Sequence, residues 1–188
     1  MCNSILRGKD YIEDWYREHI DSINSVLDIG CGRGIYPGCL KAIKPEVRWV
    51  GIEIWQPYID KYKDILNRLY DNILIMDVDE YDFNEKYDLI IMGDVLEHMS
   101  KEKAASVLFK AYTNCRYFII SIPLGNCPHE AEHGNPYQKH VVEDWTHRSV
   151  SKFIFDTTNV GIITSRIFDC AWLNNPIEIG VFICKGAL

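Results

Sequence analysis

The sequence predicts an α/β protein, a three-layer αβα sandwich around a seven-stranded, mostly parallel sheet. Short apolar runs alternate five times with stretches of helical periodicity, which indicates parallel strands covered by helices on both faces. Near the start of the chain, one buried run opens into a glycine-rich turn. Near the end, two apolar runs are joined by a loop too short for a crossover, so this C-terminal pair must be antiparallel.

The individual elements follow from periodicity and from turn residues. Apolar residues at helical spacing predict helices at 10–23, 34–43, 57–70 and 101–112. Short apolar runs predict strands at 25–29, 47–53, 72–76, 87–92, 115–123, 162–170 and 177–185. Pro37 and Pro57 both lie where a first helical turn tolerates proline.

Length and composition limit the class of protein. A chain of 188 residues fits one domain over 1–188 and buries about 70% of its unfolded surface, so it needs no disulfide or metal to fold. Its 47% hydrophobic and 25% charged residues are typical of globular proteins. A net charge of −7 and a pI of 5.3 lead us to expect no nucleic-acid partner.

Cysteine usage and the lack of long apolar runs indicate a compartment. The seven cysteines are scattered, odd in number and contain no C-x-x-C pair, which favours reduced thiols in a cytosol. No signal peptide and no run of about 18 apolar residues is visible. We therefore expect a cytoplasmic protein that makes no membrane contact, while its oligomeric state stays open.

The turn at 28–34, Asp-Ile-Gly-Cys-Gly-Arg-Gly, limits the kind of ligand. A dinucleotide-binding G-x-G-x-x-G pattern needs a third glycine where Ile35 stands. Asp28 would also repel a pyrophosphate and attract a cationic ligand. The spacing therefore favours a nucleoside cofactor without phosphates and disfavours a dehydrogenase, with an ordinary strand-to-helix turn as the structural alternative.

Two segments carry a resemblance to a known family. Asp28-x-Gly30-x-Gly32-x-Gly34 resembles the first motif of class I S-adenosylmethionine-dependent methyltransferases. Residues 93–98, Gly-Asp-Val-Leu-Glu-His, resemble the fourth motif in its D-V-L-E-H form, which many small-molecule members contain. The resemblance implies S-adenosyl-L-methionine as the cofactor and methyl transfer as the reaction.

Acidic residues at strand ends extend the predicted cofactor site. Glu53 follows Gly30 by 23 residues, close to the offset at which nucleotide-binding units place a carboxylate on ribose hydroxyls; the alternative is an exposed acid at a strand end. By the resemblance, Asp77 accepts from the adenine amino group, the backbone amide of Val78 meets the ring, and Asp94 lies where the methionyl group meets the substrate.

His98 is placed near the cofactor or in a structural role by the same resemblance, with a proton acceptor as the alternative. The complete predicted cofactor-binding set is Asp28, Ile29, Gly30, Cys31, Gly32, Gly34, Glu53, Ile54, Asp77, Val78, Gly93, Asp94 and His98.

The connection 123–147 is predicted to face the substrate. It follows a strand at the sheet edge where open α/β folds bind ligands, and long loops of this kind are usually functional. Four histidines lie in it, at 129, 133, 140 and 147. We predict that one is a general base, with His140 the first choice and His129 the second; loop histidines that only form hydrogen bonds are the alternative.

A metal site at Cys127, His129, His133 or His140 is the other interpretation of this loop. Because these spacings match no recognised zinc pattern, the sequence leads us to expect no metal.

Aromatic residues in the loop bear on the acceptor. Tyr137 and Trp145 are predicted to line a substrate pocket, or else to anchor the loop. Residues 134–137, Gly-Asn-Pro-Tyr, with His140 and Trp145 resemble methyltransferases that modify sugars or glycans. Because an alcohol acceptor benefits from a base and a neutral amine does not, we expect O-methylation of a small molecule or glycan.

Other functions remain as alternatives to this expectation. N-methylation of a small amine uses the same fold. A non-catalytic module that binds S-adenosylmethionine would lack an acceptor pocket. The Asn/Asp-Pro-Pro-aromatic run of DNA base methyltransferases is absent after the fourth strand.

Overall fold

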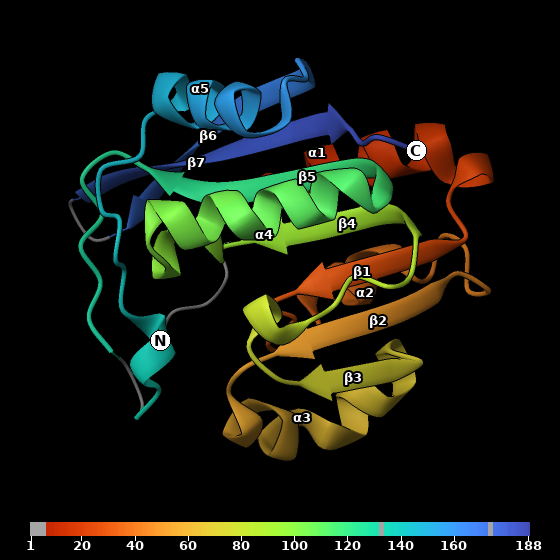
Figure 1. The fold of residues 1–188 in the computed structure, drawn as a ribbon. Coiled ribbons are helices and arrows are strands. Elements are labelled where there is room, and N and C mark those ends of the chain that lie inside the picture. The colour runs from red at the N-terminus through yellow and green to blue at the C-terminus, as the bar shows by residue number, and fades with distance from the viewer. Residues whose placement is uncertain (1–6, 132–133, 173–174) are drawn as a thin grey trace.

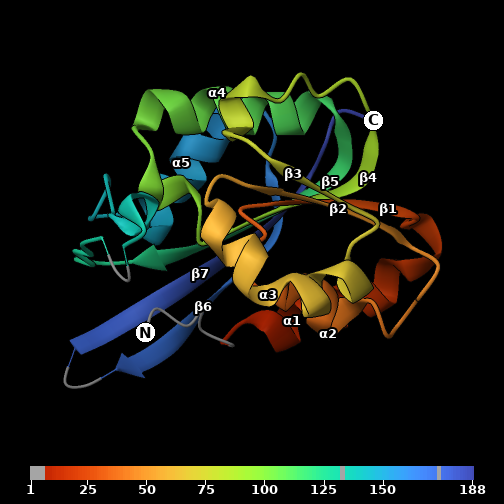
Figure 2. The ribbon, with the colours of Figure 1, turned by 90° about the horizontal axis from the view of Figure 1, so that it is seen from below.

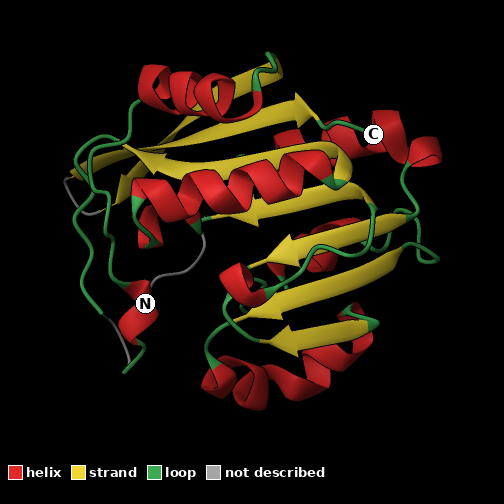
Figure 3. Ribbon diagram, in the orientation of Figure 1, coloured by secondary structure: helices red, strands yellow, loops and turns green. Residues whose placement is uncertain are grey.

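The computed structural model describes residues 7–131, 134–172 and 175–188. One seven-stranded sheet forms the middle layer, in the order β3-β2-β1-β4-β5-β7-β6 (Figure 1, Figure 3). Its strands are β1 (Ser25–Ile29), β2 (Arg48–Glu53), β3 (Asn72–Ile75), β4 (Tyr87–Gly93), β5 (Cys115–Leu124), β6 (Ile162–Trp172) and β7 (Asn175–Lys185). β1 to β5 are parallel, and β7 pairs antiparallel with both β5 and β6. The predicted fold class is confirmed.

Helices cover both faces of this sheet (Figure 2). One face carries α1 (Lys9–His19), α2 (Ile35–Leu40) and α3 (Gln56–Leu69), and the other carries α4 (Lys101–Thr113) and α5 (His147–Thr158). Short 3-10 helices are η1 (Ile20–Ser22), η2 (Val78–Glu80), η3 (Leu96–His98) and η4 (Pro136–Gln138).

The largest differences from the sequence prediction concern two helices. The helix expected over 10–23 ends at His19, and the chain continues as the 3-10 helix η1. α5 was not predicted, although its start has a clear local cause. Thr146 and Ser149 form a capping box, in which each side chain accepts from the other's backbone amide, and such a box satisfies donors that a helix start leaves open.

Successive residues of the central strands pack into two hydrophobic layers, one on each face of the sheet. On β4, Ile90 and Met92 belong to the layer under α4 and α5, whereas Leu89 and Ile91 belong to the layer under α1 to α3. This two-sided burial explains why the central strands read as continuous apolar runs, as expected for parallel strands covered by helices.

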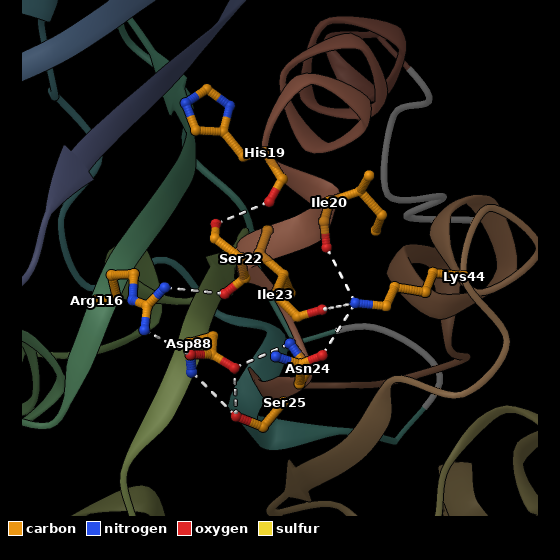
Figure 4. Close-up of polar contacts among 9 residues, drawn as sticks. All are labelled: His19, Ile20, Ser22, Ile23, Asn24, Ser25, Lys44, Asp88 and Arg116. Carbon is orange, nitrogen blue, oxygen red and sulfur yellow. Dashed lines mark hydrogen bonds and ion pairs between the residues drawn. The ribbon is translucent and has the colours of Figure 1, made fainter.

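Asp88 ties the amino ends of the central strands together, on the side away from the strand ends that carry the motifs (Figure 4). Its Oδ2 accepts from the Asn24 amide at 2.9 Å and from the Ser25 hydroxyl at 3.3 Å. Arg116 Nη2 lies 3.6 Å from Asp88 Oδ1. These contacts link β1, β4 and β5 at their starts and leave the opposite edge to carry other chemistry.

Two expectations about thiols and membranes can be compared with the structure. Cys31, Cys39, Cys115, Cys127 and Cys184 are free. Across the described residues, no helix combines the length and the apolar character that spanning a membrane requires.

The buried centre of β7 provides a test of the core. Phe182 is completely buried, whereas Phe155 on α5 is 54% exposed. We expect Phe182→Ala to lower the free energy of unfolding by about 3–5 kcal/mol through lost burial and a residual cavity. Phe155→Ala should change it by less than about 0.5 kcal/mol. Urea unfolding followed by circular dichroism measures both, and equal losses in the two variants would contradict this packing.

Candidate active site

A cavity of about 490 Å³ lies at the carboxyl ends of the parallel strands. In Figure 1 the arrowheads of β1 to β5 point to one side, and the segment after β5 runs along that side. The strand order reverses between β1 and β4, and open α/β sheets bind ligands at such switch points. The volume lies in the range of sites for small ligands.

Most of the residues predicted for the site line this cavity. The lining includes Ile29, Gly30, Cys31, Gly32, Glu53, Ile54, Asp77, Val78, Gly93, Asp94, His98, His129, Tyr137 and His140. Three predicted residues are not part of the lining: Asp28, Gly34 and Trp145. His133, which entered the metal interpretation, lies outside the described residues.

The turn after β1 is held against the end of β2. Gly30 and Cys31 donate their amides to the Ile52 carbonyl at 2.8 and 3.0 Å. Gly30 has a φ of 71°, and a Cβ there would lie 2.4 Å from Val95 Cγ2, so a side chain is excluded by both backbone and packing. The turn therefore presents bare backbone to the cavity.

Glu53 connects this turn to the next helix. Its carboxylate accepts from the Gly32 amide and from the Trp55 amide, both at 2.9 Å. Burial raises the pKa of Glu53, and these amide hydrogen bonds work against that rise. The side chain is 6% exposed and lines the cavity, so an acceptor of hydrogen bonds is fixed at the end of β2.

Asp28 lies beneath the cavity instead of in its wall. It is 1% exposed, and its Oδ2 accepts from the Tyr70 hydroxyl at 2.5 Å. Burial raises the pKa of Asp28 to about 7, although Tyr70 and Lys9 oppose the rise. We therefore assign Asp28 to supporting the turn and not to the contact with a cofactor that the sequence predicted.

Gly34 and Trp145 also have packing roles in place of the predicted contacts. A Cβ at Gly34 would lie 2.8 Å from Leu69 Cδ1 of α3, so glycine is needed for close packing of two helices. Trp145 is 3% exposed and meets Phe153 of α5 edge-on, with 5.3 Å between ring centroids. Trp145 anchors the loop, which was the stated alternative to pocket lining.

Asp77 follows β3 and is paired with a lysine that the sequence reading missed. Lys103 Nζ donates to Asp77 Oδ1 at 2.8 Å and to Oδ2 at 2.6 Å. Partial burial would raise the pKa of Asp77, but the hydrogen bond from Lys103 outweighs it and the pKa is lowered. Both residues line the cavity, so any adenine amino group would share this carboxylate with Lys103.

A second lysine, Lys9 from the start of α1, lies under the other end of the site. Lys9 is 5% exposed, and its ammonium group donates to Tyr36 Oη at 2.6 Å. Burial alone would lower the pKa of Lys9, but Tyr36, Asp94 and Asp28 outweigh it and the pKa is raised. The charge of Lys9 therefore offsets the acids around the cavity.

Tyr36 carries this contact to the cavity wall. A Cβ on Gly93 would lie 2.1 Å from Tyr36 Oη, so the missing side chain of Gly93 makes room for the phenol. Asp94 follows with a φ of 55°, a conformation that Asp tolerates better than most residues and that often marks functional sites. Its amide donates to the Ser121 carbonyl at 2.7 Å, which fixes the turn after β4 to β5.

Three histidines gather at the loop side of the cavity and form a histidine cluster: His98, His129 and His140. The His98 and His140 rings are 4.9 Å apart, and the His129 and His140 rings 5.1 Å apart. Burial lowers the pKa of His98 to about 4 and also lowers that of His140. Both imidazoles are therefore neutral at pH 7.

Glu97 lies beside this cluster and was not predicted from the sequence. It is 1% exposed and lines the cavity. Burial, together with the charge of Asp94, raises the pKa of Glu97 well above its ordinary value. The sequence signal was present, since Glu97 is the acid of the D-V-L-E-H motif, but in a 3-10 turn the spacing alone does not show which side chains face inward.

Comparison with known proteins finds a family that resembles about half of this chain. Residues 26–116, from β1 into the start of β5, match the model of a family described as a methyltransferase domain. This segment, about half of the chain, is therefore similar to a methyltransferase domain.

The chain also resembles a curated protein over about half of its length. Over 91 residues it is 33% identical to malonyl-[acyl-carrier protein] O-methyltransferase from Acetivibrio thermocellus, a match that covers 48% of this chain and 30% of that protein. The chain thus spans less than a third of that relative's length.

Solved structures share the fold at low identity. The N-terminal domain of EvdMO1, crystallised with SAH bound, is 13% identical, with a TM-score of 0.69, over 97% of this chain and 82% of that one. Magnesium protoporphyrin IX methyltransferase from Synechocystis PCC 6803, with bound SAM, is 15% identical, with a TM-score of 0.70, over 98% and 80%.

We expect Asp28 to make the stability of the protein depend on pH. Its pKa rises from 3.8 to about 7 on folding, so between these values the folded state keeps a proton that the unfolded chain has lost. This contribution is fully present below about pH 4 and is lost as the pH rises through 7, and three pKa units correspond to at most about 4 kcal/mol. We expect Asp28→Asn, which retains an acceptor for Tyr70, to remove this part of the decline.

Urea unfolding at a series of pH values between 4 and 8 measures the effect. The stability of the wild type relative to Asp28→Asn should fall across this interval, while the exposed-site variant Asp156→Asn should follow the wild type. Parallel curves for wild type and Asp28→Asn would contradict the assignment.

Proposed function

We propose that this protein transfers a methyl group from S-adenosylmethionine to a hydroxyl oxygen of a small molecule or glycan. The observation that carries the proposal is the cavity at the switch point of the sheet, which has bare glycine backbone and an acid at one end and neutral imidazoles at the other. The match to a methyltransferase domain supports the reaction, and the SAH and SAM bound by the structural relatives support the cofactor.

The residues present fit the proposed cofactor. Glu53 can accept from both ribose hydroxyls, because each carboxylate oxygen has more lone pairs than the two amide hydrogen bonds use. Asp77 and the amide of Val78 lie at the position proposed for adenine, and Asp94 lies at the position proposed for the methionyl group. When bound, the cofactor would supply an electrophilic methyl group on a sulfonium, which leaves as a neutral thioether.

The chain itself contributes position, exclusion of water and a place for a proton. The acceptor oxygen would lie beside the histidine cluster, where a neutral imidazole can take its proton as the new carbon–oxygen bond forms. We propose that one of two histidines takes this proton, with His140 the first choice and His129 the second. Tyr137, which is 46% exposed and 6.0 Å from Trp55 between ring centroids, would border the entrance for the acceptor.

N-methylation of a small amine remains the second candidate within the same reaction class, since the neutral environment that suits a base also keeps an amine unprotonated. A binding module without catalysis is less well supported, because the cavity continues past the cofactor residues to the histidine cluster.

Cofactor binding can be tested with a matched pair of glutamate variants. Isothermal titration calorimetry should show binding of S-adenosylmethionine and S-adenosylhomocysteine and none of NAD. Glu53→Gln should weaken this binding by about 10- to 100-fold, because it removes the charge from hydrogen bonds to ribose. Glu85→Gln, at an exposed ion pair with Arg48, should bind as the wild type does. Unchanged affinity in Glu53→Gln, or binding of NAD alone, would remove the cofactor assignment.

The acceptor class can be tested by turnover. A panel of small alcohols, sugars and amines is incubated with the protein and S-adenosylmethionine, and release of S-adenosylhomocysteine is followed. We expect turnover with hydroxyl acceptors. Turnover with amines alone would favour N-methylation, and none with any acceptor beside tight cofactor binding would favour the binding module.

A further inference from the structure

Glu97, His98 and His140 bring three possible metal ligands to one point in the cavity wall. One ligand atom from each side chain lies within 4.8 Å of the other two. Glu97 and His140 are buried, at 1% and 6% exposed. Two atoms that share a tetrahedral ion at about 2.1 Å lie roughly 3.4 Å apart, so shifts of about 1 Å in these side chains would bring all three into coordination.

Hydrogen bonds to backbone carbonyls fix which ring nitrogen of His98 and of His140 carries the hydrogen. Nδ1 of His98 lies 3.1 Å from the Lys139 carbonyl oxygen, and Nδ1 of His140 lies 2.6 Å from that of Cys127. A carbonyl oxygen only accepts, so each Nδ1 must carry the hydrogen and donate it. Each Nε2 then carries a lone pair, and in metalloproteins such a carbonyl contact orients a ligating histidine.

Glu97 supplies a second, independent observation that points to a ligand at this position. Among the described residues, its Oε2 is buried without a hydrogen-bond partner, and its Oε1 lies 4.0 Å from Nε2 of His98. An unsatisfied buried carboxylate oxygen is costly. A cation between Glu97 and the two imidazoles would satisfy it.

The loop is also built so that these groups meet. The amides of Val141 and Val142 donate to the Glu97 carbonyl at 2.8 and 3.1 Å, and the amide of His140 donates to the His129 carbonyl at 2.9 Å. The backbone next to His140 is therefore fastened to the 3-10 turn that carries Glu97 and His98. This arrangement keeps ligands from two distant segments of the chain in register.

We infer that Glu97, His98 and His140 form a binding site for one divalent transition-metal ion. Two imidazoles and one carboxylate are a set that suits ions of the series from Mn²⁺ to Zn²⁺ and leaves coordination positions open. Those positions face the cavity, whose lining includes all three ligands. The sequence expectation of no metal is replaced by this proposal, which keeps His140 and uses Glu97 and His98 in place of Cys127, His129 and His133.

The role of the ion rests on the proposed function, although its binding does not. A hydroxyl oxygen on the ion would lose its proton more readily, because a bound divalent cation lowers the pKa of its ligand. His140 would then be a ligand, since its single Nε2 lone pair cannot also act as the base. His129, the second predicted base, would receive the proton while the oxygen bonds to the methyl carbon and the carbon–sulfur electron pair stays on sulfur.

Metal binding can be measured without turnover. The protein is stripped with a chelator and titrated with Co²⁺ and with Mn²⁺, which are followed by visible absorption and by electron paramagnetic resonance respectively. Mn²⁺ is included because it favours oxygen and nitrogen ligands over the free thiols of the chain. We expect one ion per chain and a higher melting temperature in its presence.

Single variants identify the ligands. Glu97→Gln, His98→Gln and His140→Gln should each lower the affinity by at least about tenfold, the loss that even an outer-shell partner causes. His147→Gln is the matched control, because Nε2 of His147 pairs with the Ser165 hydroxyl at 2.9 Å and His147 is not in the cavity lining. Circular dichroism confirms that each variant folds.

The outcomes separate this inference from the proposed function. No uptake of either ion at millimolar concentration, or equal uptake by His147→Gln and all three ligand variants, would overturn the metal site. Calorimetry with S-adenosylmethionine on the same preparations tests the proposed function alone. Binding of the ion without binding of the cofactor would support the site and remove the function.

Discussion

Crowding of carboxylates at one edge of the sheet is the constraint that the rest of this structure must satisfy. Parallel pairing sends Asp28, Glu53, Asp77 and Asp94 out at neighbouring strand ends, with Glu97 a turn further on. Burial makes their mutual repulsion and their desolvation costly. The protein meets this constraint residue by residue. Asp28 is kept close to neutral by its raised pKa, Glu53 accepts two backbone amides, and Asp77 pairs with Lys103.

The positive charge that faces Asp94 comes from α1, which lies outside the segment that matches the family model. Lys9 lies before the matched segment of 26–116, yet its buried charge acts on Asp94 and Asp28 and reaches the cavity wall through Tyr36. The helix α1 is therefore part of the site and not only a cover for the sheet. Its anchoring is tight, because a Cβ on Gly8 would lie 2.9 Å from Val181 of β7.

The sequence predicted the sheet and the acids at the strand ends because the signals for them are local. These signals are the periodicity of apolar residues, the short apolar runs and the spacing of the glycines. It failed where a position depends on contacts between distant segments. The sequence around Asp28 is typical of an acid that binds a ligand. A hydrogen bond from the hydroxyl of Tyr70, 42 residues further along the chain, instead holds Asp28 beneath the cavity. Lys103 sits on a helix that shows only an amphipathic pattern, and nothing local reveals that it meets Asp77. Trp145 resembled pocket lining because an aromatic in a loop has the same local signature whether it faces a ligand or Phe153.

The histidines show how hydrogen bonding decides between roles that composition leaves equal. A base and a metal ligand both need a neutral imidazole with an exposed lone pair, and His140 meets this need through its bond to the Cys127 carbonyl. The two roles differ in which groups surround that lone pair. A base needs one imidazole next to the acceptor, whereas here a second imidazole and a buried, unsatisfied carboxylate oxygen converge on the same point. A cation beside Glu97 would offset the cost of burying its carboxylate. The convergence therefore favours the ion over the isolated base at His140.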